Sequence, residues 1–191
     1  CRAFNGCETI GFAINFAYMQ KRVLVVIGGG AAGFFCAVNT AANAPELKVM
    51  LLEKSSKLLS KVRISGGGRC NVTHACFDVP ALAKKYPRGS NFVKKTMARF
   101  GPADTIKWFG ERGVALKAEE DGRMFPETND SATIVECLLR EANRLGVEIR
   151  LNSDVIKLEH AGPKWLVHTN TDMVNCDYVC VACGGFPKLE M

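Results

Sequence analysis

The sequence GGGAAG at residues 28–33 restricts the possible folds of this chain more than any other stretch, because it matches the pattern G-x-G-x-x-G. It follows an apolar, β-branched run at residues 22–28, which is typical of a parallel strand buried on both faces. The Ala-rich residues 31–44 predict a helix that Pro45 ends, and residues 47–54 predict a second buried strand. Strand, helix and strand within about 32 residues form a βαβ unit. The sequence therefore predicts an α/β fold with a parallel sheet.

Each glycine of this pattern has an expected role in holding a dinucleotide. Gly28 allows a tight turn, Gly30 lets a pyrophosphate approach the backbone, and Gly33 lets the helix pack close to the strand. The N–H groups and the dipole at the N-terminus of the helix then hold the diphosphate. Glu53, at the end of the second strand, is expected to accept the ribose hydroxyls and to repel a 2′-phosphate. The pattern predicts a Rossmann-like dinucleotide site, but FAD and NAD(H) both use it.

A second glycine-rich stretch, ISGGGRCN at residues 64–71, favours FAD. A chain dedicated to NAD(H) in its first unit is expected to continue with further strand–helix units soon after Glu53, whereas this one becomes basic and glycine-rich without that rhythm. A bare backbone with donors from Ser65, Arg69 and Asn71 suits an extended ligand that passes over the first site. Two alternatives stay open: a surface loop without a ligand, and an NAD(H)-only dehydrogenase in which this stretch is incidental.

The rest of the chain predicts helices followed by a small antiparallel β-meander. Two helices are expected in the middle of the chain, the first from Ser90 or Asn91 to Phe100 and the second ending near Gly113. A strand pair joined by the Asp121-Gly122 turn precedes an amphipathic helix, and the chain then forms the meander and a last buried strand. The apolar stripe of the amphipathic helix consists of Ile134, Val135, Leu138, Leu139, Ala142 and Leu145.

Four stretches together resemble a known family. They are similar to the bacterial BaiN/RdsA-type NAD(P)/FAD-dependent oxidoreductases, which belong to the glutathione-reductase-like flavoproteins with two dinucleotide-binding domains. The resemblance covers residues 19 to about 188, and SGGGRCN is its most specific element. The stretches are VVIGGGAAGFFCAV, LLEKSSKLLSKVRISGGGRCNVT, GRMFPETNDSATIVECLLREANRLGVEI and DYVCVACGGFPK.

The resemblance implies a Rossmann-like FAD-binding domain in an oxidoreductase that passes hydride from NAD(P)H through FAD to an organic acceptor. It assigns no catalytic residue within this chain. It implies that the cofactor lies against one set of residues. These are Gly28, Gly30, Ala31, Ala32, Gly33, Glu53, Lys54, Gly67, Gly68, Arg69, Cys70, Asn71, Val155, Ala182 and Gly184.

The chain departs from the family in two respects. His74 stands where the family usually has Asn; it is a candidate proton donor or, as we expect, an ordinary loop histidine. Family members also continue into an inserted domain and a C-terminal segment, so we expect a C-terminally truncated chain whose residues 19–188 form the first part of the FAD-binding domain. We expect residues 1–18 to be an extension upstream of a natural start at Met19, the alternative being an ordered arm.

The nine cysteines form no secreted disulfide framework, which favours a reducing, cytoplasmic setting. Cys176-x3-Cys180-x2-Cys183 matches an iron–sulfur pattern, but its apolar strand context argues against a cluster, so no metal site is predicted. Cys180 and Cys183 as a redox pair beside a flavin remain an alternative. Arg123 in the stretch GRMFP is either functional or part of a structural salt bridge.

Residues 84–99 are basic, and a solvated helix face explains them better than a nucleic-acid surface, because aromatic residues are sparsely interleaved. We therefore expect a small-molecule substrate and no nucleic-acid partner. A tRNA-modifying flavoprotein in which this stretch faces RNA stays open as an alternative. No apolar run approaches 18 residues, so no membrane span is predicted. The oligomeric state is left open.

Overall fold

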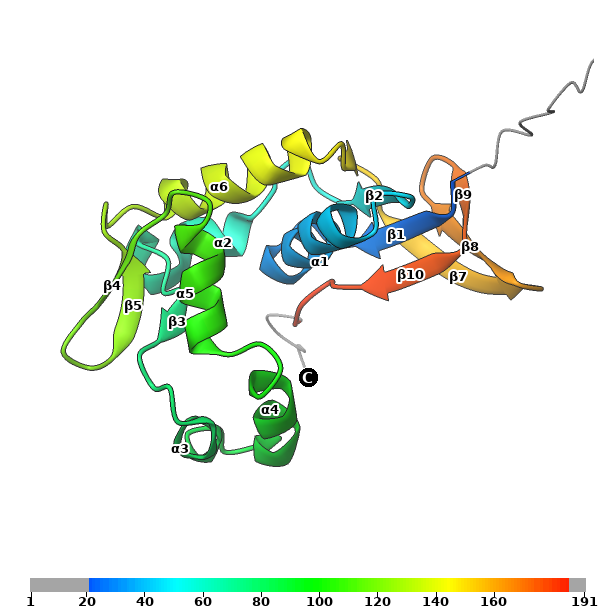
Figure 1. Ribbon diagram of the computed structural model, residues 1–191. Helices are drawn as coiled ribbons and strands as arrows, with labels where there is room; N and C mark the ends of the chain where they lie inside the picture. The colour runs from blue at the N-terminus through cyan, green and yellow to red at the C-terminus, as the bar shows by residue number, and fades with distance from the viewer. Residues whose placement is uncertain (1–20, 186–191) are drawn as a thin grey trace, which may run out of the picture.

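A computed structural model describes residues 21–185 of the chain. The expectations for residues 1–18 and for Met19 lie outside these described residues. A parallel sheet of four strands forms the centre, in the spatial order β10-β1-β2-β6 (Figure 1). The strands are β1 (Val23–Ile27), β2 (Lys48–Leu52), β6 (Glu148–Arg150) and β10 (Tyr178–Val181).

The two faces of this sheet are both covered, which makes the sheet the middle of three layers. Alternate residues of β1 and β2 point to opposite faces. On one face Leu24, Val26, Val49 and Leu51 pack among the buried side chains of the helices. On the other face Val25, Ile27, Met50 and Leu52 pack against Val167, Val174 and Cys176 of the antiparallel meander. The meander consists of β7 (Val155–Ala161), β8 (Lys164–Thr169) and β9 (Met173–Cys176).

Helices α1 (Ala31–Asn43) and α6 (Ser131–Arg144) pack against each other in the helical layer. Asp130 caps α6 by accepting a hydrogen bond from the N–H of Ala132 at 2.8 Å. The apolar stripe expected on α6 is confirmed: Ile134, Val135, Leu138 and Ala142 are buried, while Leu139 and Leu145 pack against the same core and are partly buried.

A second lobe extends beyond the carboxyl ends of the parallel strands (Figure 1). Its antiparallel sheet has the order β3-β5-β4, and the strand pair expected around the Asp121-Gly122 turn is confirmed. The helices α3 and α4 lie below α5, apart from the parallel sheet (Figure 1). The elements are α2 (Ser60–Gly68), β3 (Thr73–His74), α3 (Val79–Lys84), α4 (Ser90–Met97), α5 (Pro102–Gly110), β4 (Leu116–Ala118) and β5 (Arg123–Pro126).

The predicted α/β fold with a parallel sheet and a small antiparallel meander is confirmed, but two local expectations were wrong. The basic, glycine-rich segment after Glu53 contains the helix α2, which was not expected there. The last strand, β10, was expected to be buried, yet Tyr178 is 43% and Val181 64% exposed. The reason is that β10 is an edge strand among the described residues, with β1 on one side and no strand on the other.

Candidate functional site

The carboxyl ends of the central strands bring the expected site residues to one edge of the sheet. The N–H of Gly28 donates to the carbonyl of Leu52 at 2.8 Å, and the N–H of Ala182 donates to the carbonyl of Ile27 at 2.8 Å. These bonds continue the strand pairing past the ends of β1, β2 and β10. Ligands of open α/β sheets bind outside this edge. The glycine turn, Glu53 and Ala182 therefore lie at the edge where a dinucleotide is expected.

Gly28 and Gly33 are required by packing within the protein. Gly28 has a φ of +112°, and a Cβ there would lie 2.6 Å from the carbonyl oxygen of Ala182. A Cβ on Gly33 would lie 1.8 Å from the carbonyl oxygen of Gly28. No side chain fits at either position, because backbone atoms cannot move away as the end of a side chain can. The tight turn and the close helix–strand packing expected of these two glycines are both present.

Gly30 has a different environment, because no heavy atom lies within 4 Å of the position of its Cβ. It is the N-cap of α1 and has an extended backbone, without a side-chain cap. The first turn of α1 contains no acidic residue, and Ala31 and Ala32 are exposed. The first N–H groups of a helix have no partner within the helix, and its dipole favours negative charge there. The start of α1 is thus an open, small-residue surface with the electrostatics of an anion site.

Glu53 connects the glycine turn to the loop after β2. One carboxylate oxygen accepts the N–H of Gly29 at 2.8 Å, and the other accepts the N–H and the hydroxyl of Ser55 at 2.9 and 2.8 Å. Partial burial alone would raise the pKa of Glu53, but these hydrogen bonds and the nearby Lys54 outweigh it and lower the pKa overall. The side chain is therefore held as a carboxylate at the edge of the sheet.

The three glycines of the second stretch are explained by backbone conformation. Gly66, Gly67 and Gly68 have φ values of +56°, +69° and +85°, and Cys70 follows with +61°. Successive left-handed residues are costly for side chains with a Cβ. A Cβ on Gly66 would also lie 2.8 Å from the ring of Phe125, whereas one on Gly67 would meet no atom within 4 Å. The loop thus packs on one side and leaves open backbone at Gly67.

The polar side chains of this loop interact with other residues of the protein, and the sequence did not predict these contacts. Arg69 forms an ion pair with Glu119, and its guanidinium carbon lies 4.0 Å from the ring centroid of the buried Phe125. In the amide orientation that satisfies both of its ends, Asn71 donates to the carbonyls of Thr73 and Met124 at 2.9 and 3.3 Å. Cys70 is buried, which raises the pKa of its thiol. Arg69 and Asn71 thus hold the loop against β5, while Cys70 packs in the core.

Two other expected residues lie at this edge of the sheet, and Val155, two residues after Ser153, whose N–H donates to the carbonyl of Glu53 at 2.9 Å, is partly buried. Gly184, with a φ of +72°, follows β10 in a loop to which the Lys61 ammonium donates at the carbonyl of Gly185 (3.1 Å). Lys54 is exposed beside Glu53. The side chain of Val155 packs between the parallel sheet and the meander. Lys61 and Ser55 were missed by sequence reasoning, although the unusual density of Lys and Ser after Glu53 was a signal for them.

The other two candidates, His74 and Arg123, both contact the turn between β4 and β5. His74 is in hydrogen-bond contact with the carbonyl of Asp121 at 3.1 Å, and Arg123 pairs with the carboxylate of Asp121 at 2.6 Å. The second finding agrees with the salt-bridge interpretation of Arg123. A Cβ on Gly122 would lie 2.5 Å from the His74 ring, so this histidine packs on the β4–β5 turn.

The cysteines of the C-x3-C-x2-C pattern are separated by burial and by partners. Cys176 is buried in β9, Cys180 is half-buried and Cys183 is exposed. Burial raises the pKa of Cys36 to about 11, and the hydrogen-bonded thiol of Cys180 adds to this. Among residues 21–185, no group of three His, Cys, Asp or Glu side chains is placed to hold a metal ion.

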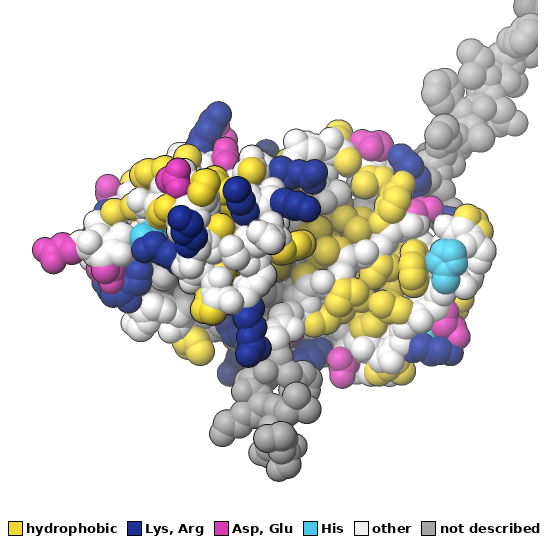
Figure 2. Space-filling model, turned by 90° about the horizontal axis from the view of Figure 1, so that it is seen from below, with side chains coloured by type: hydrophobic (Ala, Val, Ile, Leu, Met, Phe, Trp, Pro, Cys, Tyr) yellow, Lys and Arg dark blue, Asp and Glu magenta, His cyan; other side chains and the backbone are white. Residues whose placement is uncertain are grey.

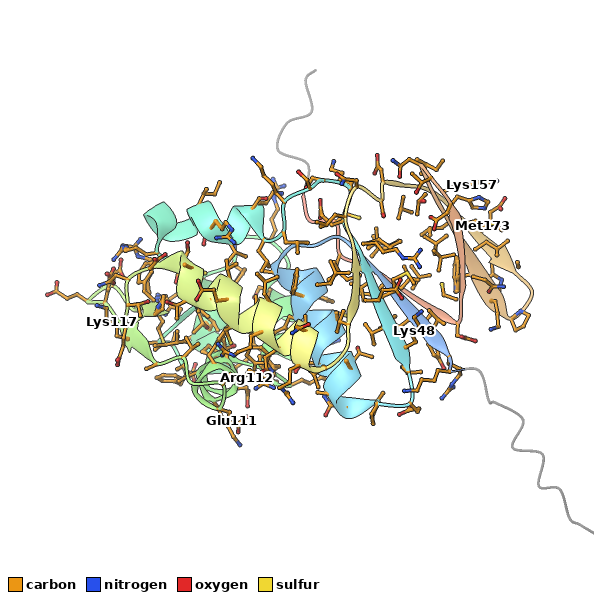
Figure 3. All side chains as sticks on the ribbon, turned by 90° about the horizontal axis from the view of Figure 1, so that it is seen from above. Lys48, Glu111, Arg112, Lys117, Lys157 and Met173 are labelled. Carbon is orange, nitrogen blue, oxygen red and sulfur yellow. The ribbon has the colours of Figure 1, made fainter. Side chains whose placement is uncertain are left out.

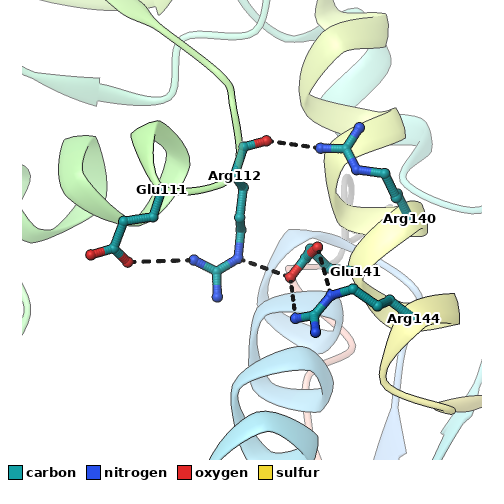
Figure 4. A pocket seen from close by; sticks show the side chains of 5 residues that line it. All are labelled: Glu111, Arg112, Arg140, Glu141 and Arg144. Atoms are coloured by element: carbon teal, nitrogen blue, oxygen red, sulfur yellow. Dashed lines mark hydrogen bonds and ion pairs between the residues drawn. The ribbon is translucent and has the colours of Figure 1, made fainter.

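A hollow of about 390 Å³ lies apart from these residues, between the end of α5 and α6 (Figures 3 and 4). It is lined by Glu111, Arg112, Arg140, Glu141 and Arg144, none of which was expected in the site. Glu141, with an 8% exposed side chain, pairs with Arg144 at 2.8 Å and with Arg112 at 3.2 Å. The Glu141 carboxylate neutralises positive charge inside the hollow, and its pair with Arg112, directly after α5, joins α5 to α6.

Among the described helices, none has the length and apolar character needed to cross a membrane.

Comparisons with known proteins identify a family and several relatives. The family described as "HI0933-like protein Rossmann domain" matches residues 22–189. The ribosomal RNA dihydrouridine synthase of Escherichia coli is 32% identical over 168 residues, which are 87% of this chain and 40% of that protein. The 3-dehydro-bile acid delta(4,6)-reductase of Clostridium scindens is 28% identical over 160 residues, which are 84% of this chain and 38% of that protein. The chain thus spans about two fifths of the length of these relatives.

Among solved structures, the chain is similar in fold to the 3-ketosteroid-delta4-(5alpha)-dehydrogenase of Rhodococcus jostii in complex with 4-androstene-3,17-dione. The TM-score is 0.63 at 13% identity, over 91% of this chain and 48% of that one. The family match and the two relatives confirm the resemblance that the four sequence stretches indicated.

Proposed function

The chain belongs to the HI0933-like family through its Rossmann domain, and from this membership we propose that it is the FAD-binding part of a flavin-dependent oxidoreductase. The observation that carries the proposal is the open backbone of Gly30 at the N-terminus of α1. The names of the two relatives support a redox activity, since one is a reductase and the other a dihydrouridine synthase.

The residues present fit the ADP half of FAD. No protein atom fills the space beside the Cα of Gly30, whereas backbone atoms occupy the corresponding space at Gly28 and Gly33. The N–H groups at the start of α1 would hold the diphosphate, since Ala31 and Ala32 place no bulk over them. The Glu53 carboxylate would accept a ribose hydroxyl while it keeps the N–H of Gly29.

The second glycine loop would extend this surface toward the flavin. The helix α2 begins at Ser60, directly after Leu59, whose N–H donates to the carbonyl of Gly29 at 2.8 Å. The helical part of α2 is residues 60–64, because Ser65, Gly66 and Gly67 have non-helical backbone, and its rise carries the chain about 7 Å before the glycines follow. The exposed Gly67 would offer backbone to the cofactor there, while Arg69 and Asn71 hold the loop in place.

FAD when bound would supply hydride transfer, with NAD(P)H as the proposed donor and an organic molecule as the proposed acceptor. The chain's own residues position the cofactor: α1 binds negative charge, and Glu53 discriminates against a 2′-phosphate by repulsion. We assign no catalytic residue to this chain.

RNA is a second candidate for the acceptor. The observation that favours it is the pair of relatives named ribosomal RNA dihydrouridine synthase, from Escherichia coli at 32% and Haemophilus influenzae at 30% identity. These names weigh against the sequence-based expectation that nucleic acid is not a partner. The bile acid reductase relative favours a small molecule instead.

A titration of the purified 191-residue chain with FAD, followed by flavin fluorescence, tests the proposal. We expect saturable binding of FAD and weaker binding of NADH. Gly30→Ala should weaken FAD binding at least tenfold without unfolding the chain, because the new methyl group meets the ligand and no protein atom. Gly110→Ala is the matched control, since it also adds a methyl group in open space but on α5. NADH binding without FAD binding, or equal losses in both variants, would overturn the proposal.

A further inference from the structure

The segment from Val79 to Arg99, which we call the α3–α4 lobe, combines high positive charge with a complete lack of acidic residues. No Asp or Glu occurs between residues 79 and 103. All six of its cationic side chains are exposed, and none forms an ion pair within the described part of the chain. They are Lys84, Lys85, Arg88, Lys94, Lys95 and Arg99.

The same lobe exposes aromatic rings. Phe92 is 74% and Tyr86 40% exposed, and Phe77, just before the lobe, is 59% exposed. The helix α4 is amphipathic, but none of its described residues is buried. Folded proteins place large apolar side chains on the surface singly, whereas three exposed rings within one short stretch of chain indicate an interaction surface.

The lobe is anchored at its end and otherwise stands apart. Phe100, directly after it, packs edge-on against Phe35 of α1, with 5.2 Å between ring centroids. Within the described chain, the hydrogen bonds of residues 79–99 all join residues close to one another in sequence. Seen from below, Lys and Arg side chains gather over the part of the molecule where α3 and α4 face the viewer (Figure 2). The cations and the rings of this lobe are therefore all exposed on the surface.

Charge complementarity decides which partner fits this surface. A polyanion gains from six unpaired cations, and the carboxylates nearest to the lobe in sequence, those of Asp78 and Asp104, accept backbone N–H groups at the starts of α3 and α5. The rings add a requirement that phosphate alone does not satisfy, since they need flat groups to stack on. Single-stranded nucleic acid offers both, with a phosphate at each step and unpaired bases that stack on aromatic side chains.

We propose that the α3–α4 lobe binds single-stranded RNA, with its Lys and Arg side chains at the phosphates and with Tyr86 and Phe92 stacked on bases. The sequence-based expectation of an ordinary solvated helix face did not include the exposure of these rings. The inference does not rest on FAD binding, because none of the residues of the lobe belongs to the proposed cofactor surface.

Fluorescence anisotropy of the 191-residue chain with a labelled single-stranded RNA 20-mer tests the proposal across a salt series. Log affinity should fall linearly with log salt. The triple variant Lys84→Gln/Lys85→Gln/Arg88→Gln should bind more weakly and make the slope shallower by about 2, because each cation at a phosphate contributes about 0.7 to the slope. Phe92→Ala should weaken binding roughly tenfold without changing the slope.

Two matched controls accompany these variants. Lys48→Gln/Lys117→Gln/Lys157→Gln removes the same charge from β2, β4 and β7, sites spread across the molecule (Figure 3), and should leave the slope unchanged. Ile156→Ala removes an equally exposed apolar side chain, 68% exposed on β7, and should leave affinity unchanged. Circular dichroism checks that each variant is folded.

Four outcomes would overturn the proposal. The first is the absence of RNA binding at low salt. The second is an equal loss of affinity in the control triple variant, which would show that net charge alone explains the binding. The third is binding to phosphatidylserine vesicles without binding to RNA, which would show a membrane surface instead. Tighter binding to a duplex of the same length would contradict the stacking of Tyr86 and Phe92 on unpaired bases.

Discussion

The Glu53 carboxylate accepts the backbone N–H of Gly29 at 2.8 Å, so the end of β2 holds the middle of the glycine turn that follows β1. The other carboxylate oxygen is used by Ser55. An acidic residue at this place is commonly explained by the ribose alone. Here it also orders the protein around the ligand surface, and that has consequences for stability without any ligand.

We expect Glu53→Gln to destabilise the chain by about 1–2 kcal/mol at neutral pH, because the amide nitrogen of Gln cannot accept from the N–H donors that face a carboxylate. Hydrogen bonds lower the pKa of Glu53 in the folded state below that in the unfolded state. Its stabilising contribution is therefore present above the unfolded pKa of about 4.3 and is lost as the pH falls through the folded value. Urea denaturation at a series of pH values measures this.

The difference in free energy of unfolding between the Glu53→Gln variant and the original chain should thus become smaller in acid. Glu136→Gln is the control, since Glu136 is exposed on α6. A constant difference from neutral pH down to acid pH would show that the carboxylate charge is irrelevant to the turn.

Gly33→Ala should destabilise the chain by roughly 2 kcal/mol or more, because its methyl group would lie 1.8 Å from the carbonyl oxygen of Gly28 and α1 would have to move away from β1. For a domain of this size this corresponds to a Tm about 5 °C lower. Gly30→Ala, three residues earlier in the same turn, should leave Tm nearly unchanged. Thermal unfolding of both variants without cofactor checks this, and equal effects would contradict the packing role of Gly33.

Much of the core was predictable from the sequence because the relevant signals are local. The β-branched run of β1, the glycine turn and the apolar stripe of α6 each dictate one element and one buried face. The positions of Gly28 and Gly33 were predictable for the same reason, since their role depends on the strand and helix directly beside them.

The second glycine loop was less predictable, because its conformation depends on distant residues. The sequence suggested a bare backbone with donors from Ser65, Arg69 and Asn71, but it did not reveal the partners of these side chains within the protein. Arg69 pairs with Glu119 and stacks on Phe125, fifty and more residues further along the chain. Likewise, the exposure of β10 depends on which strand lies beside it, which the apolar residues of β10 alone do not reveal.

Gly66 and Gly67 provide a comparison within this loop. Both have left-handed φ angles, so alanine costs about 1–2 kcal/mol at either position. At Gly66 the methyl group would also lie 2.8 Å from the Phe125 ring and 2.9 Å from the Asn71 nitrogen. Gly66→Ala should therefore destabilise the chain by about 3 kcal/mol or more, clearly beyond Gly67→Ala. Chemical denaturation measures the difference, and equal losses would mean that backbone conformation alone explains the glycines.

The last prediction concerns Glu141, which is a buried carboxylate between two arginines (Figure 4). The hydrogen bond from Arg144 is the main cause that lowers its pKa, and Arg112, which lies 3.8 Å over the Trp108 ring, lowers it further. Replacing one partner of such a group leaves uncompensated charge, so Glu141→Gln should destabilise the chain by about 2–4 kcal/mol at neutral pH.

The Glu141 contribution should be present above the unfolded pKa of about 4.3 and disappear as the pH falls through the lower folded value, so the variant and the original chain converge in acid. Arg144→Gln should cost less than about 1 kcal/mol, because the Arg144 side chain is 58% exposed and Arg112 still pairs with the carboxylate. Urea denaturation of the three chains at neutral and acid pH separates these effects. If Arg144→Gln were as damaging as Glu141→Gln, the stabilising contribution of Glu141 would come from the exposed pair within α6 and not from the buried pair with Arg112.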